Sequence, residues 1–264
     1  MRTLKQGNRR AARLLFIFMA IAAAAAPLIA GDDRVHGKFV RTLEVNGKIA
    51  LSVKNSNGKT TVRVGTDDKV HIYSTISAGT KWDCDRKSSE RKVRKFEKNH
   101  AFEMEGNHIR LGAWDDHEMA HCTLIDYEIQ VPAGTALEIE NKYGNIRIRD
   151  VGGPVDLELQ AGGARVTGAS AKVQAQIGIG TLIVEGSPGE DWFLDVGTGS
   201  VEVRLPKDAG FNLEAETEDG TIDCDFSIKY REKNGKDLLR GSVNGGGPLI
   251  HIKTEMGGIR IWER

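Results

Sequence analysis

The chain has 264 residues, and its 37 basic and 37 acidic side chains cancel near neutral pH. Without a net positive charge it is a poor candidate for nucleic-acid binding. Glycine is abundant (31), proline is scarce (6), and almost no long segment has the spacing of an amphipathic helix, whereas strict apolar–polar alternation is widespread. These features favour an all-β protein.

Residues 1–30 are predicted to be a secretory signal peptide. Five basic residues and no acidic one are followed by an apolar run from Leu14 to Ala30. Cleavage after Ala30 would leave an exported chain with 32 basic and 37 acidic residues, located in the periplasm, the cell envelope or the medium. If uncleaved, the run is about long enough to span a bilayer, and the membrane would be contacted only through this segment.

Residues 31–125 are predicted to form β-hairpins. Alternating runs are separated by Asn46-Gly47, Asn57-Gly58 and residues 66–68, and a further hairpin turns at Gly106-Asn107. Asn-Gly between alternating runs is a strong hairpin signal. We expect this region to be continuous with residues 126–264 as one domain.

A polar insertion at 82–99 interrupts the hairpins. It can be a solvated, flexible excursion or a patch that binds anionic envelope polymers or lipid headgroups by charge attraction. Seven cations make up the patch: Arg86, Lys87, Arg91, Lys92, Arg94, Lys95 and Lys98.

Three cysteines allow one disulfide and leave one thiol. Cys84 and Cys122 lie in polar, loop-like stretches, whereas Cys224 occupies a core-facing position of an alternating strand. In an oxidising compartment we therefore expect Cys84 to pair with Cys122, and Cys224 to be a buried thiol.

The sequence "HEMAH" at 117–121 matches a zinc-protease motif, in which a helix places two histidines on one face. Here the motif falls between two strands, with no helical pattern around it, so a polar loop is the favoured interpretation. A metal site remains the alternative, and its candidate ligands are Asp115, Asp116, His117 and His121, with Cys84 or Cys122. We predict no cofactor.

From residue 126 onward one unit recurs. A glycine has apolar residues seven and five positions before it and two and four positions after it, and successive glycines are 18, 18, 19, 21 and 37 residues apart. We interpret each unit as a hairpin of two short strands, stacked on its neighbours as a solenoid-like, curled sheet, with parallel stacking favoured by the constant spacing. The series ends at the carboxyl terminus, so its last member is expected to be the last rung. The glycines are Gly144, Gly162, Gly180, Gly199, Gly220 and Gly257.

The order of three motifs resembles the bacterial putative-adhesin domain family, an exported β-strand-repeat family of unknown function. A strand ends in "VPAG" at 131–134, "VRLPKDAGF" follows at 203–211, and "LRGSVNGGGPLIHIKTEMGGIRIW" closes the chain at 239–262. The resemblance implies a right-handed, β-helix-like fold at the cell envelope. It supplies no catalytic residues.

Together these observations favour a non-enzymatic binding or scaffold module whose partner is an envelope polymer or a protein. The alternative is a carbohydrate-active or metal-dependent hydrolase that uses the 115–122 loop or the wet face of the sheet. Acids recur on that face, at Glu138, Glu140, Asp156, Glu158, Glu202, Glu214 and Glu216. Convergence of such acids or of the histidines in a cleft would favour the enzyme.

Overall fold

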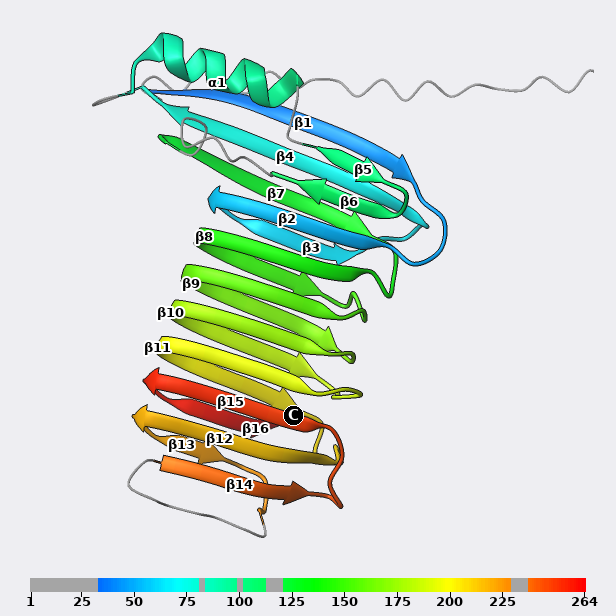
Figure 1. The fold of residues 1–264 in the computed structure, drawn as a ribbon, viewed down its shortest axis with the longest axis vertical. Coiled ribbons are helices and arrows are strands. Elements are labelled where there is room, and N and C mark those ends of the chain that lie inside the picture. The colour runs from blue at the N-terminus through cyan, green and yellow to red at the C-terminus, as the bar shows by residue number, and fades with distance from the viewer. Residues whose placement is uncertain (1–32, 81–83, 99–101, 113–120, 229–236) are drawn as a thin grey trace, which may run out of the picture. The chain divides into compact units, whose positions relative to one another are not determined.

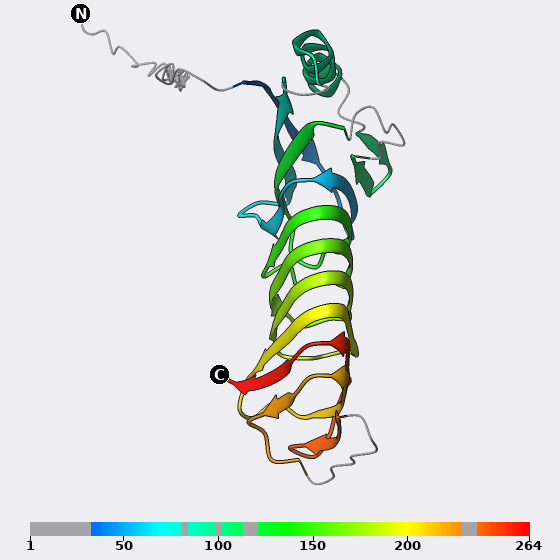
Figure 2. The same cartoon turned by 90° about the vertical axis from the view of Figure 1, so that its left-hand side faces the viewer.

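The structure, a computed structural model, describes residues 33–80, 84–98, 102–112, 121–228 and 237–264. Asp33–Arg264 form one compact unit, a tall stack of strands with one helix at its first end (Figures 1 and 2). The predicted signal peptide lies outside the described residues. Among those that are described, no helix is long and apolar enough to cross a membrane.

The described residues contain sixteen strands and one helix. They are β1 (Arg34–Glu44), β2 (Ala50–Asn57), β3 (Thr60–Val64), β4 (Lys69–Gly79), α1 (Arg86–Lys98), β5 (Glu103–Glu105), β6 (His108–Leu111), β7 (Thr123–Val131), β8 (Ala136–Arg149), β9 (Val155–Ala169), β10 (Val173–Gly186), β11 (Trp192–Leu205), β12 (Phe211–Asp219), β13 (Ile222–Cys224), β14 (Asp237–Val243), β15 (Leu249–Met256) and β16 (Ile259–Glu263).

The repeat predicted from the sequence is present as a ladder of parallel strands, which confirms the all-β, solenoid-like fold. β8, β9, β10 and β11 pair in parallel, with Gly144, Gly162, Gly180 and Gly199 side by side. The apolar positions on both sides of each glycine are buried, so the core lies between the two arms of each rung. In β8 these positions are Leu137, Ile139, Ile146 and Ile148.

The glycine lies at a bend within one long strand, not in a hairpin turn. Each arm pairs with the corresponding arm of the neighbouring rungs, and the two arms of one rung do not pair with each other (Figure 2). The hairpin interpretation of the rung was therefore wrong in this detail. The backbone N–H and C=O groups of each arm form hydrogen bonds with the rungs on either side, so the two arms of one rung need not pair across the core.

The ladder begins earlier than the sequence interpretation placed it. β2 and β3 pair in parallel with the two arms of β8, and Gly58 lies beside Gly144. Asn57-Gly58 is thus the corner of a rung, not a hairpin turn. β6 and β7 pair in the same way with β2 and β3, so they are the two arms of a preceding rung. Of the four turns predicted between residues 31 and 125, all within the described residues, only the one at Gly106 joins a true hairpin, β5–β6.

The carboxyl-terminal rung is not the last rung. β15 and β16 lie between β11 and the rung formed by β12 and β13, as the red strands between the yellow and orange ones show in Figure 1. The prediction that Gly257 belongs to the terminal rung was wrong. β14 runs antiparallel along the free edge of β12. After β14 the chain returns toward β11, and β15 and β16 each pair in parallel with a strand on both sides.

The segment interpreted as a flexible excursion is the helix α1. The side chain of Asp85 accepts a hydrogen bond from the backbone N–H of Ser88 (2.9 Å), which caps the helix amino terminus. Ser89, Val93 and Phe96 are buried, and they are spaced four and three residues apart on one helical face. The helix packs on β1 and β4 and covers the first end of the ladder (Figure 1).

Candidate functional site

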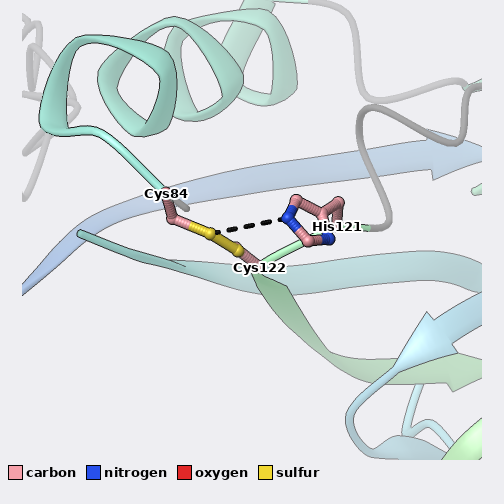
Figure 3. A group of neighbouring side chains, drawn as sticks. All are labelled: Cys84, His121 and Cys122. Carbon is pink, nitrogen blue, oxygen red and sulfur yellow. Dashed lines mark hydrogen bonds between the residues drawn. A yellow bond between two sulfur atoms is a disulfide. The ribbon is translucent and has the colours of Figure 1, made fainter. Parts of the chain in front are cut away.

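The structure joins Cys84, just before α1, to Cys122, just before β7, in a disulfide. Their Cα atoms are 6.5 Å apart, within the usual range for the bond. Nε2 of His121 lies 3.8 Å from Sγ of Cys84 (Figure 3). Cys224 is the thiol outside the bond, half-buried, with its S–H donating to the carbonyl of Phe226.

Of the predicted metal ligands, the structure places His121 beside the disulfide, and the group of Cys84, Cys122 and His121 has the spacing of a three-ligand site. A sulfur in a disulfide is not a thiolate, and thiolate is the form that binds a metal well. Asp115, Asp116 and His117 lie outside the described residues. While the disulfide is formed, neither Cys84 nor Cys122 can bind a metal as a thiolate. The metal site proposed from the sequence stays a prediction.

We expect the disulfide to stabilise the fold by closing a long loop. The two cysteines are 38 residues apart, so the Cys84→Ser/Cys122→Ser variant should lose about 3–4 kcal/mol of unfolding free energy. Urea unfolding followed by circular dichroism measures the loss, with Cys224→Ala as the control that removes a thiol but no bond. An unchanged midpoint in the double variant would contradict this role.

The predicted basic patch is only partly a surface. Arg86, Lys87, Arg91, Arg94, Lys95 and Lys98 are exposed on α1. Lys92 is buried and donates a hydrogen bond to the carbonyl of His121 (2.6 Å), so it is a packing residue that ties the helix to the disulfide. Glu90 lies within 4 Å of both Arg86 and Arg94 and partly neutralises the exposed face.

The outer surface of the ladder has two faces. We call the surface of the strand segments before the corner glycines the first-arm face (β2, β12, β15 and the first halves of β8–β11). The surface after the glycines is the second-arm face (β3, β13, β16 and the second halves of β8–β11). Because alternate residues are buried, each face displays straight rows of side chains from successive rungs.

The predicted acids lie mainly on the first-arm face. Glu138 is beside Asp156, and Glu140 is beside Glu158. Glu138 accepts a hydrogen bond from Ser52 (2.5 Å), and Glu140 pairs with Lys54 (2.8 Å). Glu214 and Glu216 continue the rows on β12, where Arg240 pairs with Glu214. These acids are spread along a flat ladder and do not converge.

The second-arm face carries arginines that the sequence interpretation did not single out. Arg147 on β8 is directly beside Arg165 on β9, and Arg63 on β3 is beside Arg149 on β8. A hollow of about 180 Å³ lies between β8, β9 and β10, lined by Arg147 and Arg165. The alternating pattern "NIRIR" at 145–149 predicts a strand, but only the strand register shows that its two arginines lie beside arginines of the neighbouring strands.

A second hollow of about 160 Å³ lies beyond β3, at the first end of this face, where β1, β3, β4 and β7 line it, and Arg63 is among the lining residues. His71, also in its lining, approaches both carboxylate oxygens of Asp67 at 3.0 Å. These hydrogen bonds lower the pKa of Asp67 below its ordinary value. Like other exposed aspartates, Asp67 is ionised at neutral pH, and its carboxylate offsets part of the positive charge at this end.

Comparisons with known proteins show which structures and which family this chain is similar to. The crystal structure of a putative cell adhesion protein from Clostridium sporogenes has a TM-score of 0.51 at 14% identity, over 87% of this chain and all of that one. That of a putative adhesin from Bacteroides fragilis has a TM-score of 0.39 at 13% identity, over 85% and 97%. No curated protein matches the sequence significantly. The sequence model of Toastrack DUF4097 matches residues 31–261. Since this match spans most of the chain, the protein belongs to the Toastrack DUF4097 family, a β-repeat family of unknown function.

Proposed function

We propose that this protein is an exported envelope component whose stacked rungs serve as a non-catalytic binding or scaffolding surface. The observation that carries the proposal is the in-register display of outward side chains. On both faces, equivalent side chains of successive rungs line up in rows. Neighbouring rungs are about 4.8 Å apart, and a continuous buried core lies beneath them. Such a surface suits an extended partner that contacts several rungs at once.

Two further points support the proposal. The Clostridium sporogenes structure, which has the same fold, is described as a putative cell adhesion protein. In addition, Glu138, Glu140, Asp156 and Glu158 form a flat ladder, whereas acid–base cleavage needs carboxylates arranged around a bound bond. Among the described residues, the displayed rows are the surface feature that a partner could bind.

We expect the purified protein to sediment with envelope fractions of the producing cells and to leave their polysaccharides intact. Sedimentation with membranes and cell-wall material measures the binding. A variant with Arg86, Lys87, Arg91 and Arg94 changed to glutamine tests whether the exposed face of α1 carries it. Retention in the supernatant under all salt conditions would contradict a binding role.

The hydrolase alternative predicts a different result. Incubation with envelope polysaccharides should then release reducing ends, and the Glu138→Gln and Asp156→Asn variants should abolish the release. Under our proposal, the length distribution of the polysaccharide stays unchanged and both variants behave as the parent protein does.

A further inference from the structure

The four arginines of the second-arm face form a cluster of like charge on three adjacent strands. Arg63, Arg147 and Arg149 are exposed, and Arg165 is half-buried. Neighbouring strands are only about 4.8 Å apart, and like charges directly opposite one another destabilise a sheet. Within the described part of the chain, none of these four side chains forms an ion pair or a hydrogen bond. The cluster therefore carries positive charge that no ion pair of its own neutralises within the described residues.

The same face is compensated where the ladder continues. Arg204 on β11 pairs with Glu202 at 2.6 Å, and Arg264 pairs with Glu185 on β10 at 2.7 Å. Arg260 on β16 approaches Asp223 at 4.0 Å. The later rungs thus supply an acid near each arginine, whereas β3, β8 and β9 do not. The difference marks the first rungs as the place where an external anion would be stabilised.

The cluster borders a shaped hollow. Gly163 occupies an outward position at which the adjacent rungs carry Asn145 and Thr181, and its missing side chain opens a space of about 180 Å³. Its floor and walls include Arg147, Arg165 and the apolar side chain of Ile183. Drug-sized ligands need roughly 300–1,000 Å³, so this hollow suits one ring of a longer chain.

Polar groups at the rim are oriented for a ligand that both donates and accepts hydrogen bonds. Oδ1 of Asn145 accepts from the backbone N–H of Gly163 (3.1 Å), which leaves its NH₂ group to donate outward. The hydroxyl of Thr181 accepts from Ser200 (3.3 Å) and keeps its own proton to donate. Guanidinium groups bind carboxylate and sulfate in a bidentate way.

We infer that the second-arm face of β3, β8 and β9 binds an acidic polysaccharide. One sugar ring would lie over Gly163, against Ile183, with its hydroxyls on Asn145 and Thr181. Its carboxylate or sulfate would bind Arg147 and Arg165, and the next anionic group along the chain would reach Arg149 and Arg63. The first-arm face of the same rungs carries Glu138, Glu140, Asp156 and Glu158, which repel such a polymer and restrict it to one side.

This inference rests on the proposed binding function and names its ligand class and its face. The test is the affinity of the purified protein for polygalacturonate and dextran sulfate, measured by affinity electrophoresis and calorimetry at 0.05–0.3 M salt as a practical range about the physiological one. Neutral dextran is the reference polymer. We expect binding to one or both acidic polymers that weakens with salt, and no binding to dextran.

The Arg147→Gln/Arg165→Gln variant should lose at least about tenfold in affinity, because two charge-assisted hydrogen-bonding groups are removed. Arg91→Gln/Arg94→Gln on α1 makes the same charge change on exposed residues and should change the affinity less than about twofold. Gly163→Ser, which narrows the hollow without altering the charge, should also weaken binding. Circular dichroism and the urea midpoint verify that each variant is folded.

Three results would overturn the inference. The first is absence of binding to both acidic polymers, and the second is equal loss of affinity in the two arginine variants. The third is salt-dependent dimerisation in ultracentrifugation that both Arg147→Gln/Arg165→Gln and Glu138→Gln/Asp156→Asn abolish, which would make the acidic face of a second copy the occupant. If the protein still sediments with envelope fractions in any of these cases, the proposed function stands and only the ligand and face assigned here fail.

Discussion

Gly162→Ala is expected to lower the unfolding free energy by about 3–5 kcal/mol, a large part of the total stability of a domain. Gly162 lies at a corner of the ladder with φ of +144°, a conformation that residues with a side chain rarely adopt. An added Cβ would lie 1.7 Å from the carbonyl oxygen of Gly144 in the rung above. The obstacle is backbone, so relief requires moving one rung away from the next.

A matched control separates the two causes. Gly134 also has a positive φ, +77°, but an added Cβ there meets no atom within 4 Å. Gly134→Ala should therefore lose only the conformational part, roughly 1 kcal/mol. Urea unfolding of both variants measures the difference. Equal losses would show that the close approach of the rungs does not decide the need for glycine.

Deletion of residues 249–264 is expected to unfold the end of the ladder, although these residues are the carboxyl terminus. β15 and β16 lie between β11 and β12, and Ile250, Ile252, Ile259 and Ile261 are completely buried. Each buried isoleucine contributes about 1.5–3 kcal/mol. Removing all four therefore costs about as much as the entire unfolding free energy of a typical domain. The deletion also leaves β11 and β12 without the strands that lie between them.

Limited proteolysis measures the outcome. In the deletion variant, cleavage within β12 and β14 should occur well before cleavage within residues 126–205, because β12 and β14 lose their link to the rest of the core. Deletion of Glu263 and Arg264 alone is the control and should leave these strands protected. If β12 and β14 stay protected in the long deletion, β12 packs on the ladder independently of the inserted rung.

The repeat could be predicted from the sequence because its information is local. The spacing of apolar residues around Gly144, Gly162, Gly180 and Gly199 specifies two arms, their buried faces and a corner. Equal spacing from unit to unit also favours parallel, in-register stacking, which the pairing shows. The same template fits Gly58, with Leu51, Val53 and Val62 buried around it, but Asn57-Gly58 is also a strong hairpin signal.

The helix α1 shows a different limit. Its buried positions Ser89, Val93 and Phe96 have helical spacing, and Asp85 is a capping residue. The same segment carries seven cations and a single aromatic residue, Phe96, so its composition favours a solvated loop over a packed helix. The helix is stabilised by packing against β1 and β4, and this tertiary contact cannot be inferred from the local sequence.

By itself, then, the sequence determined the length of the repeat, its glycines and the residues that face the core, but not that the two arms of one rung stay unpaired with each other. The tertiary structure decided which rung lies beside which, because the backbone groups of an arm are satisfied equally well by any neighbour in register. That choice places the carboxyl-terminal rung inside the ladder. Register also decides which outward side chains meet, so the four arginines of the second-arm face become one cluster only when β3, β8 and β9 are stacked.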